Sequence, residues 1–164
     1  MVKTDFSDGG KSNRQNIEVE FAIGCKKAAI NKPKLCQIIQ STCRRFGITA
    51  ALVSVAVMDD TQISRINERF LNRKGITDVI SFDLSGENED RKVYAIAVNA
   101  EMALRQSKAR PHSDEAELAL YILHGLLHNL GFDDSTPAQA NQMHAVEDEI
   151  LQNFDYGIVY NNNE

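Results

Sequence analysis

The segment HGLLHNLGFDD carries the residue types and the spacing of a metal site. His124 and His128 are four residues apart, so on an α-helix their side chains share one face with Cβ atoms about 5–6 Å apart. The two imidazoles can therefore bind a single ion. Gly125 stands where zinc peptidases with this histidine spacing place their general-base glutamate, which disfavours a peptidase.

Two carboxylates follow this histidine pair. Gly131 lies where helices commonly end in a left-handed residue, and the resulting chain reversal can return Asp133 or Asp134 to the histidines. Two histidines and one carboxylate leave a coordination position for water. This arrangement is typical of a catalytic metal site rather than a closed structural one.

The helix that carries the histidines is apolar on nearly every side and is expected to be buried. One polar stripe interrupts it, formed by Glu117, Tyr121, His124 and His128. A buried polar stripe is costly unless its groups are hydrogen-bonded or bind a metal. The remaining histidines, His112 and His144, are expected at surface or helix-start positions.

Hydrophobic patterning predicts the elements that position this site. Strands are expected at Ile17–Ile23, Ala51–Met58, 78–84 and 92–98. Helices are expected at 34–46, after Asp59 or Asp60, after Asn99, after Ser113 and from Thr136 to near Phe154. The order β-α-β-α-β-β-α-α-α predicts an α+β fold, a single small mixed sheet of about four strands with helices packed on it. The metal site would lie at the end of a buried helix.

The length of 164 residues suits one compact domain. We expect that domain at residues 15–155, between a flexible tail at 1–14 and a frayed end at 156–164. The sequence contains neither an apolar run of about 18 residues nor a signal-peptide pattern, so a cytoplasmic location is expected.

Charge is divided unevenly along the chain, whose net charge is −5. All 18 Lys and Arg residues lie within residues 1–110, whereas residues 111–164 carry acidic residues and no basic ones. A basic portion can follow a phosphate backbone, and a divalent ion can offset part of the acidic charge. The pattern is compatible with a nucleic-acid partner and equally with solvated surface charge.

The chain resembles the YbeY family of metal-dependent endoribonucleases. HGLLHNLGF followed by two aspartates is similar to the family motif, and LNRKGITDVISFDL, IAVNAEMA and QMHAVEDEIL extend the likeness over about residues 15–153. The resemblance implies one Zn²⁺ or another divalent ion and cleavage of single-stranded RNA. It further implies roles in small-subunit rRNA maturation and ribosome quality control, with rRNA and ribosomal small-subunit components as partners and with no DNA or membrane partner.

The family usually has a third histidine ten residues after the first, where this chain has Asp134. The resemblance therefore assigns the metal to His124, His128 and Asp134, with Asp133 as the second choice. Aspartate is an accepted zinc ligand at about 2.0–2.2 Å. The substitution adds negative charge at the site and shifts its preference toward harder ions.

Two further departures lie outside the motif. The loop before Asp78 is about two residues shorter than the usual family form, which carries a functional arginine. Arg73, and next Lys74, is the candidate for that arginine, which would bind a phosphate and offset transition-state charge. The pair Tyr94-Ala95 stands where the family usually has Gly-Asp.

The reaction implied is metal-assisted hydrolysis of a phosphodiester, with Glu117 orienting a metal-binding histidine. The alternative is a non-catalytic ribosome-assembly factor with a structural metal. In that case the acidic run Glu147, Asp148 and Glu149 would face a protein partner or solvent. A zinc peptidase is a minor alternative.

Overall fold

The computed structural model describes residues 16–157 and residue 159. The predicted element order is confirmed within these residues. The elements are β1 (Ile17–Ile23), α1 (Lys32–Arg45), β2 (Ala51–Met58), α2 (Asp60–Leu71), β3 (Val79–Asp83), β4 (Lys92–Asn99), α3 (Ala100–Ala109), α4 (Asp114–Asn129) and α5 (Pro137–Asn153). The tail expected at residues 1–14 lies outside the described residues.

The strands form one open mixed sheet in the order β1-β2-β4-β3. β1, β2 and β4 are parallel, and β3 pairs antiparallel with β4. Parallel neighbours need a crossover connection, and α1 supplies the one between β1 and β2. The predicted α+β fold with a small mixed sheet is confirmed.

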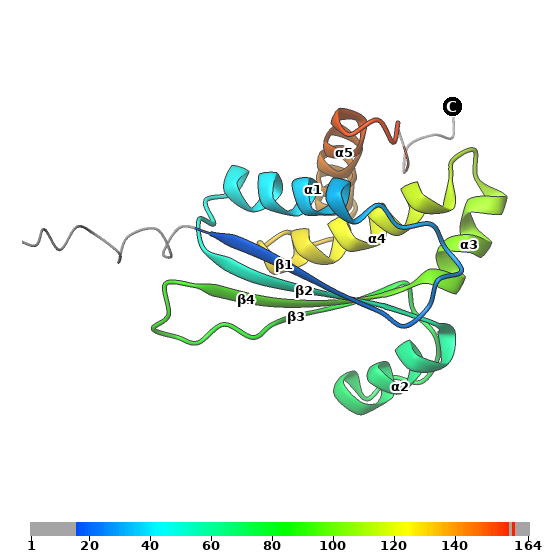
Figure 1. The fold of residues 1–164 in the computed structure, drawn as a ribbon, viewed down its shortest axis with the longest axis horizontal. Helices are drawn as coiled ribbons and strands as arrows, with labels where there is room; N and C mark the ends of the chain where they lie inside the picture. The colour runs from blue at the N-terminus through cyan, green and yellow to red at the C-terminus, as the bar shows by residue number, and fades with distance from the viewer. Residues whose placement is uncertain (1–15, 158, 160–164) are drawn as a thin grey trace, which may run out of the picture.

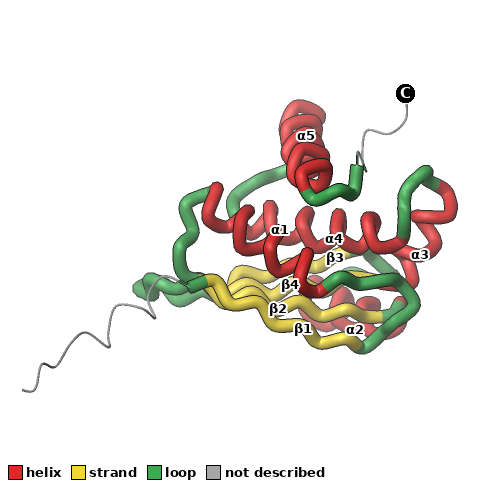
Figure 2. The backbone as a smooth tube through the Cα atoms, turned by 45° about the horizontal axis from the view of Figure 1, so that its top comes forward, coloured by secondary structure: helices red, strands yellow, loops and turns green. Residues whose placement is uncertain are grey.

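Helices cover the two faces of the sheet unequally. α1 and α4 lie on one face, α5 packs against α4, α3 lies at one end, and α2 lies on the opposite face (Figures 1 and 2). The main core lies between the sheet and the α1/α4 layer, with Ile38, Ile39, Val55, Ile122 and Leu126 at most 1% exposed. α4 is therefore a central helix, as its apolar sequence predicts.

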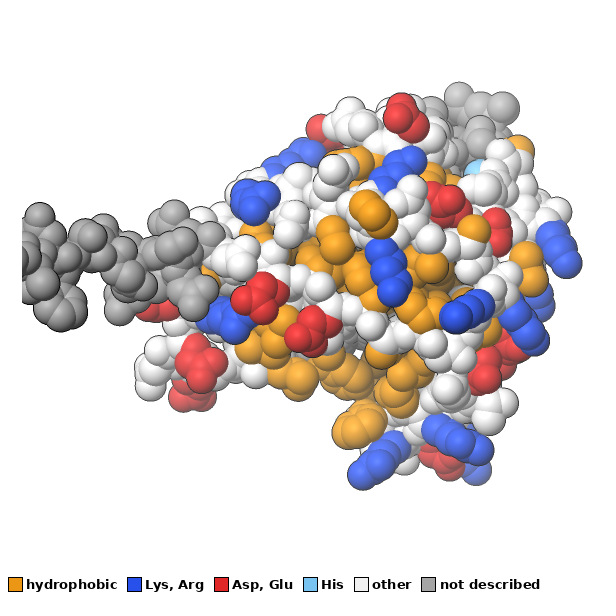
Figure 3. Space-filling model, in the orientation of Figure 1, with side chains coloured by type: hydrophobic (Ala, Val, Ile, Leu, Met, Phe, Trp, Pro, Cys, Tyr) orange, Lys and Arg blue, Asp and Glu red, His pale blue; other side chains and the backbone are white. Residues whose placement is uncertain are grey.

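The face that α2 shares is covered less completely. A small cluster of Ile63, Ile80 and Ala97 joins α2 to the sheet. Large hydrophobic side chains stay exposed nearby, among them Phe70 at 60% and Leu84 at 62%. Hydrophobic side chains also gather below the sheet, beside α2, in Figure 3.

Gly125 lets α4 lie close to the sheet. A Cβ atom at this position would stand 2.8 Å from Val79 Cγ2 and 3.0 Å from Ile96 Cγ2. Both distances are too short for methyl groups in van der Waals contact, since carbon atoms prefer about 3.5–4.0 Å. The absence of a side chain at Gly125 therefore determines how closely α4, which carries both histidines of the motif, packs against the sheet.

Replacing Gly125 by alanine is expected to lower the free energy of unfolding by about 1–3 kcal/mol, because the added methyl overpacks the core. Urea denaturation of both proteins measures the change. Val79→Ala removes the contacted methyl, so the two substitutions together should cost less than their sum. Equal stability of wild type and Gly125→Ala would contradict this packing argument.

Two described residues of the segment expected to fray, Tyr156 and Val159, make hydrogen bonds to the folded domain. The hydroxyl of Tyr156 donates to Glu115 Oε1 at 2.8 Å, and the Val159 backbone N–H donates to Asp148 Oδ1 at 3.2 Å. Val159 is 1% exposed, so this part of the expected frayed end packs on the core instead.

No helix in the described part of the chain combines the length and the apolar composition needed to span a membrane.

Candidate metal centre

The end of α4 is built to turn the chain back on itself. Gly131 has φ of +100°, a left-handed conformation that glycine adopts without a steric penalty. The Gly131 N–H donates to the His128 carbonyl at 3.1 Å, and the Phe132 N–H donates to the Leu127 carbonyl at 3.0 Å. This pair of hydrogen bonds is the Schellman arrangement, and it directs the following loop toward the histidines.

Three donor atoms meet at this turn. His124 Nε2 and His128 Nε2 are 3.0 Å apart, and Asp134 Oδ2 lies 3.5 Å from the first and 3.6 Å from the second. A tetrahedral ion with bonds of about 2.0–2.2 Å holds its ligand atoms roughly 3.3–3.6 Å apart. Both distances to Asp134 lie in this range, and the two histidine nitrogens are slightly closer to each other than it, so a small rotation of the rings would fit the three donors to one small divalent ion.

The far side of each imidazole fixes which nitrogen faces the site. His128 Nδ1 is 3.1 Å from the Phe132 carbonyl, and His124 Nδ1 is 2.6 Å from Glu147 Oε1. A carbonyl oxygen only accepts, so the Nδ1 of neutral His128 carries the proton and its Nε2 presents a lone pair. Glu147 imposes the same tautomer on His124. Two lone pairs and the Asp134 carboxylate thus converge, and this donor set suits a cation.

Glu147 is a fully buried carboxylate, 0% exposed, that forms hydrogen bonds with two imidazoles. Its second oxygen lies 2.9 Å from His144 Nδ1. Burial lowers the pKa of His124, but the hydrogen bond and charge of Glu147, with the charges of Asp78 and Asp134, outweigh it and leave that pKa above its usual value. Protons therefore compete with a metal for His124, and metal affinity should fall in acid.

The two adjacent aspartates have different surroundings. Asp133 Oδ1 accepts from Ser135 Oγ at 2.6 Å and from the Asp134 N–H at 2.8 Å. The hydrogen bond from Ser135, followed by the one from the Asp134 backbone, lowers the pKa of Asp133. Asp133 thus holds the loop, while the carboxylate of Asp134 reaches the histidines. His124, His128 and Asp134 are called the donor trio below.

The sequence model of the YbeY family, described as endoribonuclease YbeY, matches residues 20–155. The chain belongs to the YbeY family.

Individual YbeY relatives agree with this assignment. A protein of Macrococcus caseolyticus named endoribonuclease YbeY is 37% identical over 111 residues, which cover 63% of this chain and 72% of the relative. A protein of Moorella thermoacetica with the same name is 33% identical over 128 residues, which cover 71% and 82%. The chain is therefore a member of an enzyme family whose named members are endoribonucleases.

A solved structure shares the fold. The solution structure of TM1509 from Thermotoga maritima superposes with a TM-score of 0.56 at 20% identity, covering 85% of this chain and 92% of that one. This likeness concerns the fold alone.

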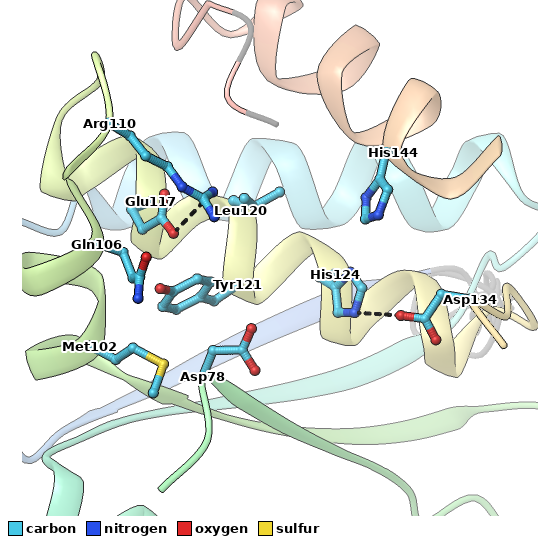
Figure 4. A pocket seen from close by; sticks show the side chains of 10 residues that line it. All are labelled: Asp78, Met102, Gln106, Arg110, Glu117, Leu120, Tyr121, His124, Asp134 and His144. Atoms are coloured by element: carbon cyan, nitrogen blue, oxygen red, sulfur yellow. Dashed lines mark ion pairs between the residues drawn. The ribbon is translucent and has the colours of Figure 1, made fainter. Parts of the chain in front are cut away.

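A cavity of about 410 Å³ opens beside the donor trio of this YbeY chain (Figure 4). Its lining residues come from the start of β3, from α3, from the α3–α4 connection, from α4, from the loop after α4 and from α5. They are Asp78, Met102, Gln106, Arg110, Glu117, Leu120, Tyr121, His124, Asp134 and His144. The cavity therefore runs along α4 from the donor trio toward Glu117.

The structure corrects the expected role of Glu117. Its carboxylate is 1% exposed and contacts His112 Nε2 and Arg110, not a metal-binding histidine. Burial, together with the charge and the hydrogen bond of Glu117, raises the pKa of Tyr121. Glu147 instead orients His124.

His112 and His144 are not surface residues. The His112 side chain is 4% exposed directly before α4, so only its helix-start placement agrees with the prediction. The His144 side chain is 13% exposed and lines the cavity. The signal that sequence reasoning missed is the spacing of His144 and Glu147, three residues apart and on one face of α5.

The acidic run on α5 is also mostly internal. Glu147 is 0% exposed and Asp148 is 7% exposed, so neither faces a partner or solvent as expected. Glu149 does reach the surface, where it pairs with Arg45 at 3.1 Å.

The candidate cations of the short loop lie outside the cavity. Arg73 and Lys74 are exposed in the connection between α2 and β3, and neither lines the cavity. The Tyr94 side chain is 2% exposed in β4, where burial raises its pKa to about 12. The Tyr94-Ala95 departure therefore places a large side chain in the core.

Proposed function

We propose that this chain is a metal-dependent endoribonuclease that cleaves single-stranded RNA during maturation of the small-subunit rRNA. The observation that carries the proposal is the convergence of two histidine lone pairs and one carboxylate within 3.6 Å of each other at the wall of an open cavity. A closed structural site would need a fourth protein ligand. Membership of the YbeY family supplies the RNA substrate class.

Zn²⁺ is the proposed ion, because histidine nitrogen and aspartate oxygen are among its usual ligands. When bound, such an ion polarises a phosphoryl oxygen and generates a nucleophile from water at neutral pH. His124 and His128 would bind it through Nε2, while Glu147 and the Phe132 carbonyl hold the protons on Nδ1. Asp134 would complete the protein ligands.

Arg73 remains a proposed phosphate-binding residue. Because it does not line the cavity, it would bind a part of the RNA that extends beyond the cavity. Its exposed position between α2 and β3 leaves the guanidinium accessible to a strand crossing that loop. We further propose a cytoplasmic location, contact with ribosomal small-subunit components and a part in ribosome quality control, all from the family resemblance.

Removing the metal is expected to abolish cleavage of single-stranded rRNA fragments, because the donor trio alone supplies no electrophile. The assay treats purified protein with a chelator, dialyses it, and follows fragment cleavage on denaturing gels before and after Zn²⁺ is restored. Mn²⁺ and Mg²⁺ in parallel reactions test the choice of ion. Cleavage that is indifferent to the chelator would contradict the proposal. Bound metal without cleavage would favour the non-catalytic assembly factor.

A further inference from the structure

An arginine occupies the end of the cavity away from the donor trio. The Arg110 side chain reaches from the α3–α4 connection toward Glu117 and lies over α4 (Figure 4). Among the described residues that line the cavity, Arg110 is the only lysine or arginine. The acidic residues in the lining are Asp78, Glu117 and Asp134.

The backbone holds Arg110 in place. A residue before proline is restricted to extended conformations, and Arg110, followed by Pro111, has φ of −128° and ψ of 155°. Its N–H donates to the Ser107 carbonyl at 3.3 Å, and Ser113 caps the next helix through the Ala116 N–H at 3.1 Å. The side chain therefore starts from a fixed point at the rim of the cavity.

Glu117 attracts the guanidinium but leaves its donors available. Arg110 Nη1 lies 3.7 Å from Glu117 Oε1, which exceeds hydrogen-bonding distance, and the Arg110 side chain is 39% exposed. The Arg110 side chain makes no hydrogen bond within the described part of the chain. Glu117 is also in contact with His112 Nε2. The N–H groups of the guanidinium can therefore bind a ligand in the cavity while the carboxylate restrains it.

We propose that Arg110 binds an RNA phosphate one or two nucleotides away from the one at the donor trio. Glu117, beside Arg110, and His124 of the donor trio are seven residues apart on α4, which is a rise of about 10 Å along the helix. Without Arg110, a phosphate at this end would meet the carboxylates of Asp78 and Glu117 and be repelled. A guanidinium can bind phosphate through two parallel hydrogen bonds. The inference rests on the proposed function, because it needs RNA in this cavity.

The test compares Arg110→Gln with Lys108→Gln, which removes the same charge from an exposed position in α3 outside the cavity. Affinity for a fluorescent single-stranded RNA is measured by anisotropy with the full chain in chelator, over a series of salt concentrations. Arg110→Gln is expected to weaken binding roughly 10-fold or more, since a hydrogen bond to a charged group is worth that factor. The salt slope should fall by about 1. Lys108→Gln should match wild type, and Arg110→Lys should keep the wild-type salt slope.

A second arm locates the phosphate with metal-loaded protein. Single-turnover cleavage is measured on an RNA with a mapped cleavage position, in which each flanking phosphate is replaced in turn by an uncharged methylphosphonate. The affinity of wild type for the RNA should fall when one particular flanking phosphate is replaced. The affinity of Arg110→Gln should not change with the same replacement. The metal content of Arg110→Gln should equal that of wild type.

Three results would overturn the inference. The first is wild-type RNA affinity in Arg110→Gln with a lowered melting temperature, which would mean that Arg110 only balances Glu117. The second is a matching loss in Lys108→Gln, and the third is equal sensitivity of both proteins to every methylphosphonate. Failure of the proposed function would appear differently, as a wild-type protein without metal-dependent cleavage, and the anisotropy arm does not depend on cleavage.

Discussion

His128→Ala should bind Zn²⁺ at least about 100-fold more weakly than wild type and lose RNA cleavage in proportion. The estimate follows because loss of an outer partner alone typically costs ~10–100-fold, and His128 supplies one of the three donors itself. His128 Nε2 lies 3.0 Å from His124 Nε2 and 3.6 Å from Asp134 Oδ2, so the substitution leaves two of the three converging donors. Competition with a chromophoric chelator measures the affinity.

The neighbouring aspartates supply the control. Asp133→Asn keeps the loop acceptor and should retain both metal and cleavage, whereas Asp134→Ala should lose both. Asp134→His restores the usual donor of the family and should bind Zn²⁺ at least as tightly as wild type. If Asp133→Asn lost the metal and Asp134→Ala kept it, the assignment of the third ligand would be reversed.

Glu147→Gln should weaken metal binding by about 10–100-fold while leaving the donor trio intact. The substitution keeps the shape of a side chain that is 0% exposed. It removes the negative charge of Glu147, whose Oε1 lies 2.6 Å from His124 Nδ1 and accepts the proton of that nitrogen in a hydrogen bond. An uncharged amide acceptor makes His124 a weaker ligand. Affinity and cleavage rate are measured side by side at fixed pH.

Glu149→Gln is the matched control on the same helix, because that carboxylate is 55% exposed and pairs with Arg45 at the surface. It should behave as wild type. The pKa of His124, raised mainly by Glu147 against the effect of burial, should fall in Glu147→Gln. Metal binding by this variant should consequently be less sensitive to acid than that of wild type. Unchanged affinity in Glu147→Gln would show that Glu147 is not the residue that orients His124.

The local parts of the site were predictable from sequence. The i, i+4 histidines, the left-handed Gly131 and the capping box at Thr136 and Gln139 each depend on residues only a few positions apart. The strand at Ala51–Met58 was predictable from its valine-rich sequence, and the structure shows it with alternating buried and half-buried residues. Such patterns act within one element, so the sequence alone reveals them.

The rest of the site depends on contacts between distant elements. Glu147 lies 23 residues after His124 and meets it only because α5 packs against α4. Arg110 enters the cavity through the geometry of the α3–α4 connection, and Asp78 enters it from the start of β3. Neither periodicity nor spacing encodes such placements. Which of the two aspartates lies near the histidines likewise depends on the hydrogen bond that Asp133 accepts from Ser135.

The packing of Gly125 limits which new activities this scaffold can acquire. The zinc-peptidase motif has a glutamate directly after its first histidine, where this chain has Gly125. A single Gly125→Glu substitution would therefore give this chain the peptidase motif. The side chain would point at Val79 and Ile96 of the sheet, however, and not at the cavity. Evolution of this nuclease fold into a peptidase would therefore require α4 to move away from the sheet first. The two histidine motifs differ by one residue in sequence but need different packing of the helix that carries them.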